Sequence, residues 1–370
     1  MKKILMIAPF SGVLNGQSIA NQMVYSGLVK KYNTDCINTL KETKFTNKSE
    51  QGKFIFSKFF KVFIALFGEL RQILSGEYDV VYMTSGQSFL GFMRFTPYML
   101  VCIIKRIPYY NHIHGGYFRV MYDSQGKLKQ KLLDFFIKKS NGMIVLGESL
   151  KSMFHEIIPE NKILVCENGV QDEIVATKDE IKEKIENYKN DTKKRVIYLS
   201  NLMIEKGILD LLKVSEKFSE DEIEFGLAGA IEPKIKNIVE DYLNKYPNKI
   251  KYYGIVNGEL KKKLLLENYI FILPTYYSNE GQPISILEAY ATGCAVITDE
   301  KVGGIRDIFK DKKNGINIKN RNVDDIFRAI NNINELSYFE SNYKTLNEKY
   351  TKNMFVERII KILKGERCTI

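Results

Sequence analysis

Cysteine is scarce in this sequence, and its arrangement excludes the structures that cysteine usually builds. The 370 residues include five cysteines, which lie far apart, are odd in number and form no C-x-x-C pair. Disulfide frameworks and structural zinc sites need paired or closely spaced cysteines. The sequence therefore predicts a reducing compartment and no zinc site.

An uncharged apolar run that crosses a membrane is also missing, because no stretch reaches the roughly 18 residues that a spanning helix needs. The nearest is the phenylalanine-rich segment 54–74, which Lys58, Lys61, Glu69 and Arg71 interrupt. This pattern is typical of an amphipathic helix with exposed aromatic side chains. Two interpretations stay open: the helix packs on the sheet of its own domain, or it contacts a membrane.

Acidic residues are too few to balance the basic ones. Lysine and arginine number 55 against 44 aspartates and glutamates, which gives a formal net charge of +11. Zinc-finger spacing, an RNA-recognition motif and a basic-region helix are all absent, so nucleic acid is not an expected partner. Anionic phospholipid and a polyanionic substrate both suit a basic surface. A lysine-rich composition without a binding role explains the charge equally well.

The length exceeds that of a usual single core and predicts two domains with a cleft. Residues 3–10 and 195–199 are apolar runs, each followed by a turn and a helical pattern, which is typical of the opening βα unit of a doubly wound domain. Strand and helix signals alternate throughout, with a helix predicted at 89–105 and a strand at 108–114. The predicted fold class is α/β, with two Rossmann-like doubly wound domains facing a cleft.

The domain boundaries follow from a shift in composition. Residues 173–194 are rich in lysine and glutamate and nearly free of aromatic side chains, so we place the interdomain connection there. The prediction is an N-terminal domain at 1–172 and a C-terminal domain at 195–350. Residues 351–370 are expected to form an amphipathic helix that returns to the first domain.

The most informative segment is 274–298, in which a strand, a polar loop and a helix follow one another. Free backbone N–H groups at a helix start bind phosphate. At this helix start they belong to Gln282, Ile284 and Ser285, because Pro283 has no N–H.

Two glutamates flank these amides: Glu280 before the turn and Glu288 about one turn inside the helix, with seven residues between them. The pattern E-x7-E, followed at 289–296 by A-x-A-x-G-x-x-V, resembles the retaining glycosyltransferases of family 4, or group 1, many of which serve polysaccharide biosynthesis. The resemblance implies the GT-B fold, with Glu280 on hydroxyls of the donor sugar and Glu288 on the ribose. Two solvated helix carboxylates are the alternative.

A second matching segment is Leu199-Ser200-Asn201-Leu202, followed by Glu205-Lys206-Gly207. It resembles the family's strand and K-G turn, so Lys206 is implied to neutralise the departing diphosphate. A fixed cation accelerates the reaction because the leaving group gains charge in the transition state. Asn201 stands where family members carry an arginine, which weakens the predicted diphosphate binding. A surface lysine is the alternative for Lys206.

Residues 111–116, NHIHGG, end the predicted strand at 108–114. By alternation His112 and His114 share one face, and His114 lies at the carboxyl end of the strand, where open α/β sheets bind ligands. It resembles the histidine that the family places beside the donor sugar. We therefore predict a catalytic role for His114 and a structural role for His112.

Two more positions complete the predicted donor site. Gly16 lies in the turn after the first strand, where glycine permits close approach of donor phosphate, although an ordinary turn is an equally good interpretation. Val256 matches the family segment whose backbone contacts the nucleotide base. No D-x-D sequence and no His/Cys cluster is placed to bind a metal, so Lys206 and the helix N-termini are expected to supply the positive charge.

The resemblance extends over nearly the whole chain and implies retaining hexosyl transfer from a nucleotide diphosphate sugar, without a cofactor. It also implies that the domain at 1–172 binds the acceptor and that the domain at 195–350 binds the nucleotide-sugar donor. UDP is favoured because it is common in the family. The basic charge and segment 54–74 favour a glycan or lipid-linked glycan acceptor of bacterial surface polysaccharide, such as capsule, at the cytoplasmic face of the cell membrane. Alternatives are a non-catalytic GT-B partner of an active transferase and a GT-B sugar-nucleotide epimerase.

Overall fold

The computed structural model describes residues 3–10, 16–40, 56–319 and 322–366. Within helix α2 (Phe56–Ser75) it describes side chains from residue 66 onward. The first residues of the predicted segment 54–74 and Cys368 therefore lie outside the described residues. The chain divides into two compact units: unit 1 is Met1–Glu167 with Phe355–Ile370, and unit 2 is Asn168–Met354.

Unit 1 is built on a six-stranded parallel sheet in the order β2-β1-β3-β4-β5-β6. Three of its strands, β1, β3 and β5, are short apolar runs whose side chains are buried on both faces, as parallel sheets covered by helices require, whereas the edge strand β2 is polar and half-buried. The strands are β1 Lys3–Ala8, β2 Asn33–Asn38, β3 Val80–Met83, β4 Tyr109–His112, β5 Gly142–Val145 and β6 Ile163–Val165.

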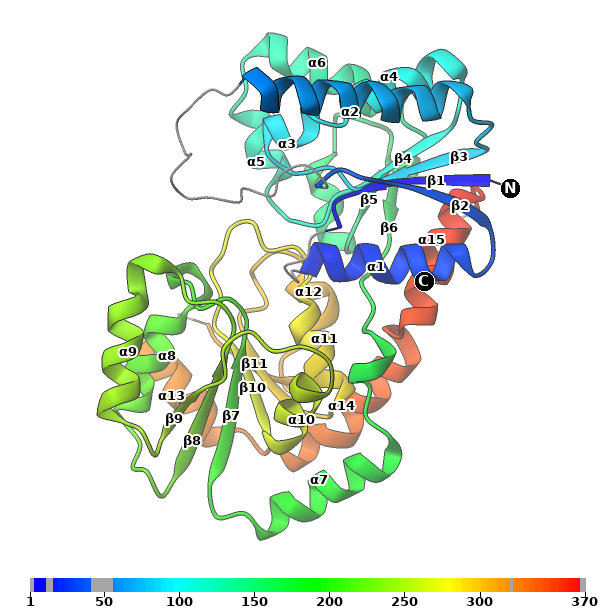
Figure 1. Cartoon of the computed structure of the whole chain (residues 1–370). Coiled ribbons are helices and arrows are strands. Elements are labelled where there is room, and N and C mark those ends of the chain that lie inside the picture. Colours follow the sequence, from blue (N-terminus) through cyan, green and yellow to red (C-terminus); the bar gives the residue numbers. More distant parts are fainter. Residues whose placement is uncertain (1–2, 11–15, 41–55, 320–321, 367–370) are drawn as a thin grey trace. The chain divides into compact units, whose positions relative to one another are not determined.

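Helices cover both faces of this sheet, and Figure 1 shows α2, α4 and α6 on one face and α1 on the other. Right-handed crossovers account for the arrangement, because the chain moves one way across the sheet from β1 to β2 and the other way from β2 to β6. The helices are α1 Gly16–Val29, α2 Phe56–Ser75, α3 Phe89–Met93, α4 Thr96–Lys105, α5 Phe118–Asp123 and α6 Lys127–Lys139, with 3₁₀ turns η2 Glu148–Met153 and η3 Glu160–Lys162.

Unit 2 repeats the architecture with a six-stranded parallel sheet in the order β12-β11-β10-β7-β8-β9. Both sheets are therefore of the doubly wound Rossmann type that the alternating signals predict. The strands are β7 Lys194–Leu199, β8 Ile223–Ala228, β9 Ile250–Tyr252, β10 Ile270–Leu273, β11 Ala295–Thr298 and β12 Gly315–Asn317.

The charged stretch before β7 forms helix α7, and its start has a clear cause. Thr177 accepts from the backbone N–H of Glu180, and the Glu180 carboxylate accepts from the N–H of Thr177, which makes a capping box. The helices of this unit are α7 Lys178–Asn190, α8 Ile208–Ser215, α9 Lys236–Lys245, α10 Gly258–Glu267, α11 Ile284–Ala291, α12 Ile305–Ile308, α13 Val323–Asn332 and α14 Leu336–Lys349, with 3₁₀ turns η4 Asp172–Ile174, η5 Ile204–Lys206 and η6 Pro233–Ile235.

The last helix, α15 (Lys352–Leu363), begins in unit 2 and continues in unit 1. In unit 1 it packs closely against α1, as Gly27 shows: a Cβ at this position would lie 2.4 Å from the side chain of Val356. Lys31, just after α1, also forms an ion pair with Glu357. Of the helices in the described part of the chain, none is both long and apolar enough to cross a membrane.

Candidate functional site

The strand order of unit 2 reverses between β7 and β10, which are neighbours in the sheet. Doubly wound domains bind ligands at the carboxyl end of such a strand pair. The segment after β7 carries Lys206, and the segment after β10 carries Glu280. The backbone N–H of Tyr276 donates to the carbonyl of Glu205 at 2.8 Å and so joins the two segments.

Glycine at position 207 permits this close approach. Gly207 has a φ of +77°, and a Cβ there would lie 2.3 Å from the carbonyl oxygen of Pro274. Both the left-handed conformation and the contact favour glycine. In the K-G pair, close packing therefore explains the glycine, whereas the predicted role of the lysine rests on its charge.

Lys206 and Glu280 form an ion pair, with Nζ 3.1 Å from Oε2 and side chains that are 16% and 9% exposed. Thr275 Oγ1 donates to the same carboxylate oxygen at 3.4 Å. The ammonium also lies 5.5 Å from the centroid of the Tyr277 ring. An ammonium has three N–H donors, so Lys206 keeps donors for an anionic ligand while the carboxylate fixes its position.

The glycine pair at 303–304 supports the Glu280 loop from behind. Gly304 N–H donates to the carbonyl of Gly281 at 2.7 Å. Gly303 has a φ of +52°, and a Cβ there would lie 2.1 Å from the carbonyl oxygen of Glu280. Any larger residue at 303 would push the Glu280 backbone away from its position.

Glu288 lies on α11 and is paired with a lysine that the sequence did not single out. Lys261 Nζ, from α10, lies 2.9 Å from Glu288 Oε1, and the two side chains are 8% and 3% exposed. The pair fixes one carboxylate oxygen of Glu288. Within the described ranges no ion pair or hydrogen bond joins the Lys261–Glu288 pair to the Lys206–Glu280 pair.

The start of α11 is held by the beginning of unit 2. Gln282 Oε1 accepts from the backbone N–H of Asn168 at 2.6 Å, and Asn168 Nδ2 donates to the Gln282 carbonyl at 3.0 Å. Pro283 occupies the N-cap position, and no side chain caps the helix. The amides of Ile284 and Ser285 therefore belong to an uncapped first turn, which suits an anion.

Asn201 follows β7 and Val256 follows β9, both at the carboxyl edge of the unit 2 sheet. Asn201 is exposed, and its carbonyl accepts from the Tyr198 hydroxyl at 2.9 Å, which also reaches the Lys206 carbonyl at 3.3 Å. The side chain of Val256 is buried in the core of unit 2, whereas its neighbour Ile255 is 61% exposed. Tyr198, which the sequence did not indicate, thus ties together the two ends of the loop that carries Lys206.

In unit 1 the two predicted histidines stack at the end of β4. The rings of His112 and His114 have centroids 4.1 Å apart, and the Tyr82 hydroxyl is 2.7 Å from His112 Nδ1. Burial lowers the pKa of His114 to about 3, and burial followed by the neighbouring His114 lowers the pKa of His112 well below its ordinary value. Both rings are therefore neutral at pH 7.

Among the described residues, buried polar atoms without a hydrogen-bond partner gather at this carboxyl edge of the unit 1 sheet. Thr84 and Ser85 follow β3, Asn111 and His112 end β4, and Asn21 on α1 bonds the carbonyl of Pro9, just after β1. Buried polar groups are normally paired, so a cluster of unpaired ones marks a place for ordered water or a polar ligand. The atoms are Asn21 Oδ1, Thr84 Oγ1, Ser85 Oγ, Asn111 Nδ2, His112 Nε2 and His114 Nε2.

Residues 178–354 match the family model described as "Glycosyl transferases group 1". An uncharacterized glycosyltransferase of Methanocaldococcus jannaschii is 27% identical over 279 residues, which are 70% of this chain and 70% of that relative. The chain is a glycosyltransferase.

Solved structures extend the likeness of this glycosyltransferase to both units. HepE from Anabaena, in complex with UDP, superposes with a TM-score of 0.72 at 14% identity, over 99% of this chain and 100% of that chain. Sucrose-phosphate synthase from Thermosynechococcus elongatus gives a TM-score of 0.74 at 12% identity, over 99% of each chain. The predicted GT-B fold of the glycosyltransferase is confirmed.

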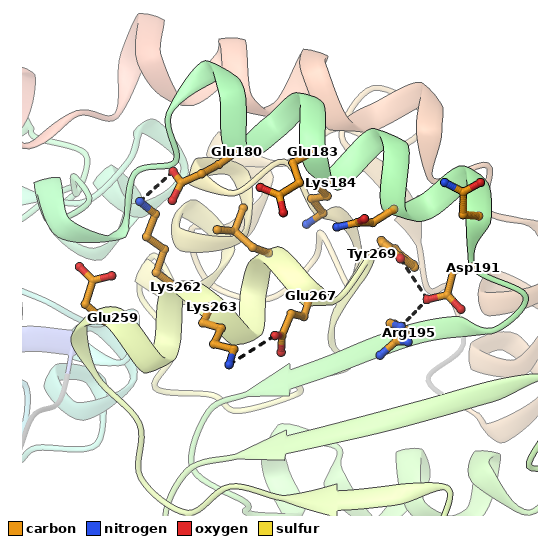
Figure 2. Close-up of a pocket in the computed structure, with 13 residues that line it drawn as sticks. Glu180, Glu183, Lys184, Asp191, Arg195, Glu259, Lys262, Lys263, Glu267 and Tyr269 are labelled. Carbon is orange, nitrogen blue, oxygen red and sulfur yellow. Dashed lines mark hydrogen bonds and ion pairs between the residues drawn. The ribbon is translucent and has the colours of Figure 1, made fainter.

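A pocket of about 690 Å³ lies elsewhere in unit 2, between α7, α10 and the start of β7. Figure 2 shows that several of its charged side chains pair with one another, as Glu180 does with Lys262 at 2.9 Å and Lys263 with Glu267 at 3.7 Å. It opens at the amino end of β7, opposite the edge that carries Lys206. The glycosyltransferase therefore has its candidate donor site at the carboxyl edge and not in this pocket.

The other predicted positions have these places in the glycosyltransferase. Gly16 is exposed and begins α1, and its neighbour Asn15 lies outside the described residues. In the part of the chain that the structure describes, no three His, Cys, Asp or Glu side chains form a metal-binding group.

Proposed function

We propose that the glycosyltransferase transfers a hexosyl unit, with retention, from a UDP-sugar to a glycan or lipid-linked glycan acceptor of a bacterial surface polysaccharide. The observation that carries the proposal is the Lys206–Glu280 contact at the switch point of unit 2. It brings together the cation and the carboxylate that a nucleotide-sugar donor needs, from segments that are far apart in sequence.

In the proposed reaction Glu280 holds hydroxyls of the donor sugar and Lys206 faces the diphosphate. The bond from the anomeric carbon to the phosphate oxygen breaks, and a bond to the acceptor oxygen forms on the same face. The proton of the acceptor hydroxyl passes to the departing phosphate, so UDP leaves as the product. Lys206 stabilises the charge that the diphosphate gains in the transition state.

The uncapped amides of Ile284 and Ser285 supply partial positive charge for the diphosphate, and Glu288 accepts from the ribose hydroxyls. No metal ion and no cofactor take part in the proposed reaction. UDP is proposed as the nucleotide because the similarly folded HepE has been solved with UDP and with UDP-glucose.

The unpaired polar atoms of unit 1 support a sugar-containing acceptor. Asn111 Nδ2 is a donor, Asn21 Oδ1 is an acceptor, and the hydroxyls of Thr84 and Ser85 are both. A mixed set of this kind suits the hydroxyl groups of a glycan. His114, which is neutral, belongs to this set as a hydrogen-bonding group rather than as a charged acid. We place the enzyme in the cytoplasm, with the acceptor at the inner face of the cell membrane.

The test is to incubate the full chain with UDP-, GDP- and dTDP-sugars and to measure donor binding and nucleotide release. Glu280→Ala and Lys206→Ala are expected to abolish most of the release. Lys263→Ala and Glu267→Ala, which remove an exposed ion pair of the same unit, are matched controls that keep it. Absence of binding to every donor would overturn the proposal in favour of a non-catalytic partner. Conversion of the sugar nucleotide without nucleotide release would overturn it in favour of an epimerase.

A further inference from the structure

Helix α6 carries a second apolar stripe that is not buried in the core of unit 1. Leu133, Phe136 and Ile137 are buried beneath the helix. On its outer side Leu128, Leu132 and Phe135 follow at i, i+4 and i+7 and are 84%, 41% and 45% exposed. Residues at this spacing lie on one face of a helix, so the exposed side chains form a continuous row.

The neighbouring helices of the same layer also carry exposed apolar side chains. Helices α2, α4 and α6 lie on one face of the unit 1 sheet, and α4 packs against both of the others (Figure 1). Leu100 and Ile104 on α4 are 45% and 67% exposed, and Phe67 and Leu74 on α2 are 67% and 52% exposed. Seven of the fourteen large exposed apolar side chains of the described residues thus lie in these three helices, which we name the α2–α4–α6 face.

Free lysines border the stripe. Helix α6 contains five lysines and one acid, Asp134, which pairs with Lys138. Lys129 lies over the ring of Phe89. For Lys127, Lys131 and Lys139 the described part of the chain offers no ion-pair partner, and all three are exposed. An exposed apolar stripe bordered by unpaired lysines is the pattern of a helix that lies in the surface of an anionic membrane.

We infer that the α2–α4–α6 face binds the surface of an anionic phospholipid bilayer, with its leucines and Phe135 in the headgroup region and its lysines on the lipid phosphates. A second copy of this chain fits the face poorly, because a two-fold contact would set the lysines of α6 against the same lysines of the partner. The inference rests on the proposed function only in that a lipid-linked acceptor gives the membrane its role.

The test uses the full chain in sedimentation with vesicles of phosphatidylcholine, pure or with about 30% phosphatidylglycerol, in about 0.1 M salt. One variant carries Leu128→Ser, Leu132→Ser and Phe135→Ser, and a second carries Lys127→Gln, Lys131→Gln and Lys139→Gln. Matched controls on unit 2 are Ile238→Ser with Leu260→Ser and Leu336→Ser, and Lys182→Gln with Lys236→Gln and Lys344→Gln, all at exposed positions.

Wild type and both controls are expected to sediment with the phosphatidylglycerol vesicles. The lysine variant is expected to bind them about 100-fold more weakly. The stripe variant is expected to bind at least about 10-fold more weakly. Wild-type binding is also expected to weaken as salt rises, because the lysine contribution is screened.

Three outcomes overturn the inference: wild type that stays unbound with the anionic vesicles, a stripe variant that binds as wild type does, or a lipid-free wild-type dimer that the stripe changes convert to a monomer. UDP release from a water-soluble donor, measured without lipid, separates this inference from the proposed function. Both α6 variants are expected to keep that release. If neither the wild type nor any variant releases UDP, the proposed function is contradicted, and the vesicle result remains a valid test of membrane binding.

Discussion

The ammonium of Lys206 lies 3.1 Å from the carboxylate of Glu280, and the two residues come from segments that follow neighbouring strands of unit 2. The contact places a cation and a carboxylate side by side in the proposed donor site. Asn201 stands where the family resemblance implies an arginine, so in the proposed reaction we expect the leaving diphosphate to depend on Lys206 more strongly than it would with two cations present.

Lys206→Ala is therefore expected to lower kcat for nucleotide release by roughly 100- to 1,000-fold. Part of the loss reflects the missing cation and part reflects the freed carboxylate of Glu280. Steady-state assays of UDP release measure the effect, and Lys263→Ala, at an exposed position of α10, is the matched control. If Lys206→Ala has the same kcat as Lys263→Ala, Lys206 takes no part in the reaction.

Glu280→Ala is expected to cost more in kcat than Glu288→Ala. Contacts to the donor sugar change during transfer, whereas contacts to the ribose stay nearly the same in the ground and transition states. Glu288→Ala should therefore act mainly on KM for the donor. Separate measurement of kcat and KM for both variants checks this, and equal losses confined to KM would contradict the division of roles.

Lys261→Met is expected to destabilise the protein by about 3–5 kcal/mol, because it leaves the buried carboxylate of Glu288 without its partner. The double change Lys261→Met with Glu288→Gln should recover much of the loss, because no buried charge then remains unpaired. Urea unfolding measures both. The exposed Lys263→Met is the control and should change the free energy of unfolding by less than about 1 kcal/mol.

The buried histidines of unit 1 predict a pH-dependent stability. Burial lowers the pKa of His114 to about 3, whereas an unfolded histidine titrates near pH ~6.5. Between these two pH values the unfolded chain therefore binds a proton on His114 that the native chain does not bind. Stability is full above pH ~6.5 and falls as the pH drops from there towards about 3.

His114→Gln removes this proton uptake. Between pH 6.5 and pH 5 its free energy of unfolding is expected to fall by about 1.5 kcal/mol less than that of wild type. Urea unfolding at the two pH values measures the difference. His155, which is 53% exposed, provides the control His155→Gln with wild-type behaviour. An unchanged pH dependence in His114→Gln would show that this histidine titrates normally in the native state.

The sheets were predictable because buried parallel strands are nearly continuous apolar runs, as at residues 3–8 and 194–199. The prediction of one helix at 89–105 was wrong in detail, since the structure has α3 and α4 there. Pro97 lies in the first turn of α4. Proline favours the start of a helix and disfavours its interior, so one helix ends before this point and a new helix begins there.

The motif led to Lys206 and Glu280, but periodicity says nothing about their contact, because 73 residues separate them. Lys261 was missed because it stands in a run of three lysines that resembles a solvated helix face. Thr84, Ser85 and Asn111 were missed for a similar reason: burial of a polar side chain depends on what packs over the strand ends, and the residue type alone does not indicate it.

Gly303→Ala tests the support behind the glutamate without touching a charged group. The new Cβ would lie 2.1 Å from the carbonyl oxygen of Glu280, at a backbone φ of +52° that L-residues rarely adopt. The Glu280 loop must therefore shift, and we expect kcat to fall by about 100-fold, because small displacements of positioning groups cost that much. Gly126→Ala, which meets no atom within 4 Å, is the matched control with wild-type kcat. Wild-type activity in Gly303→Ala, with folding confirmed by urea unfolding, would mean that the position of the Glu280 backbone does not limit the reaction.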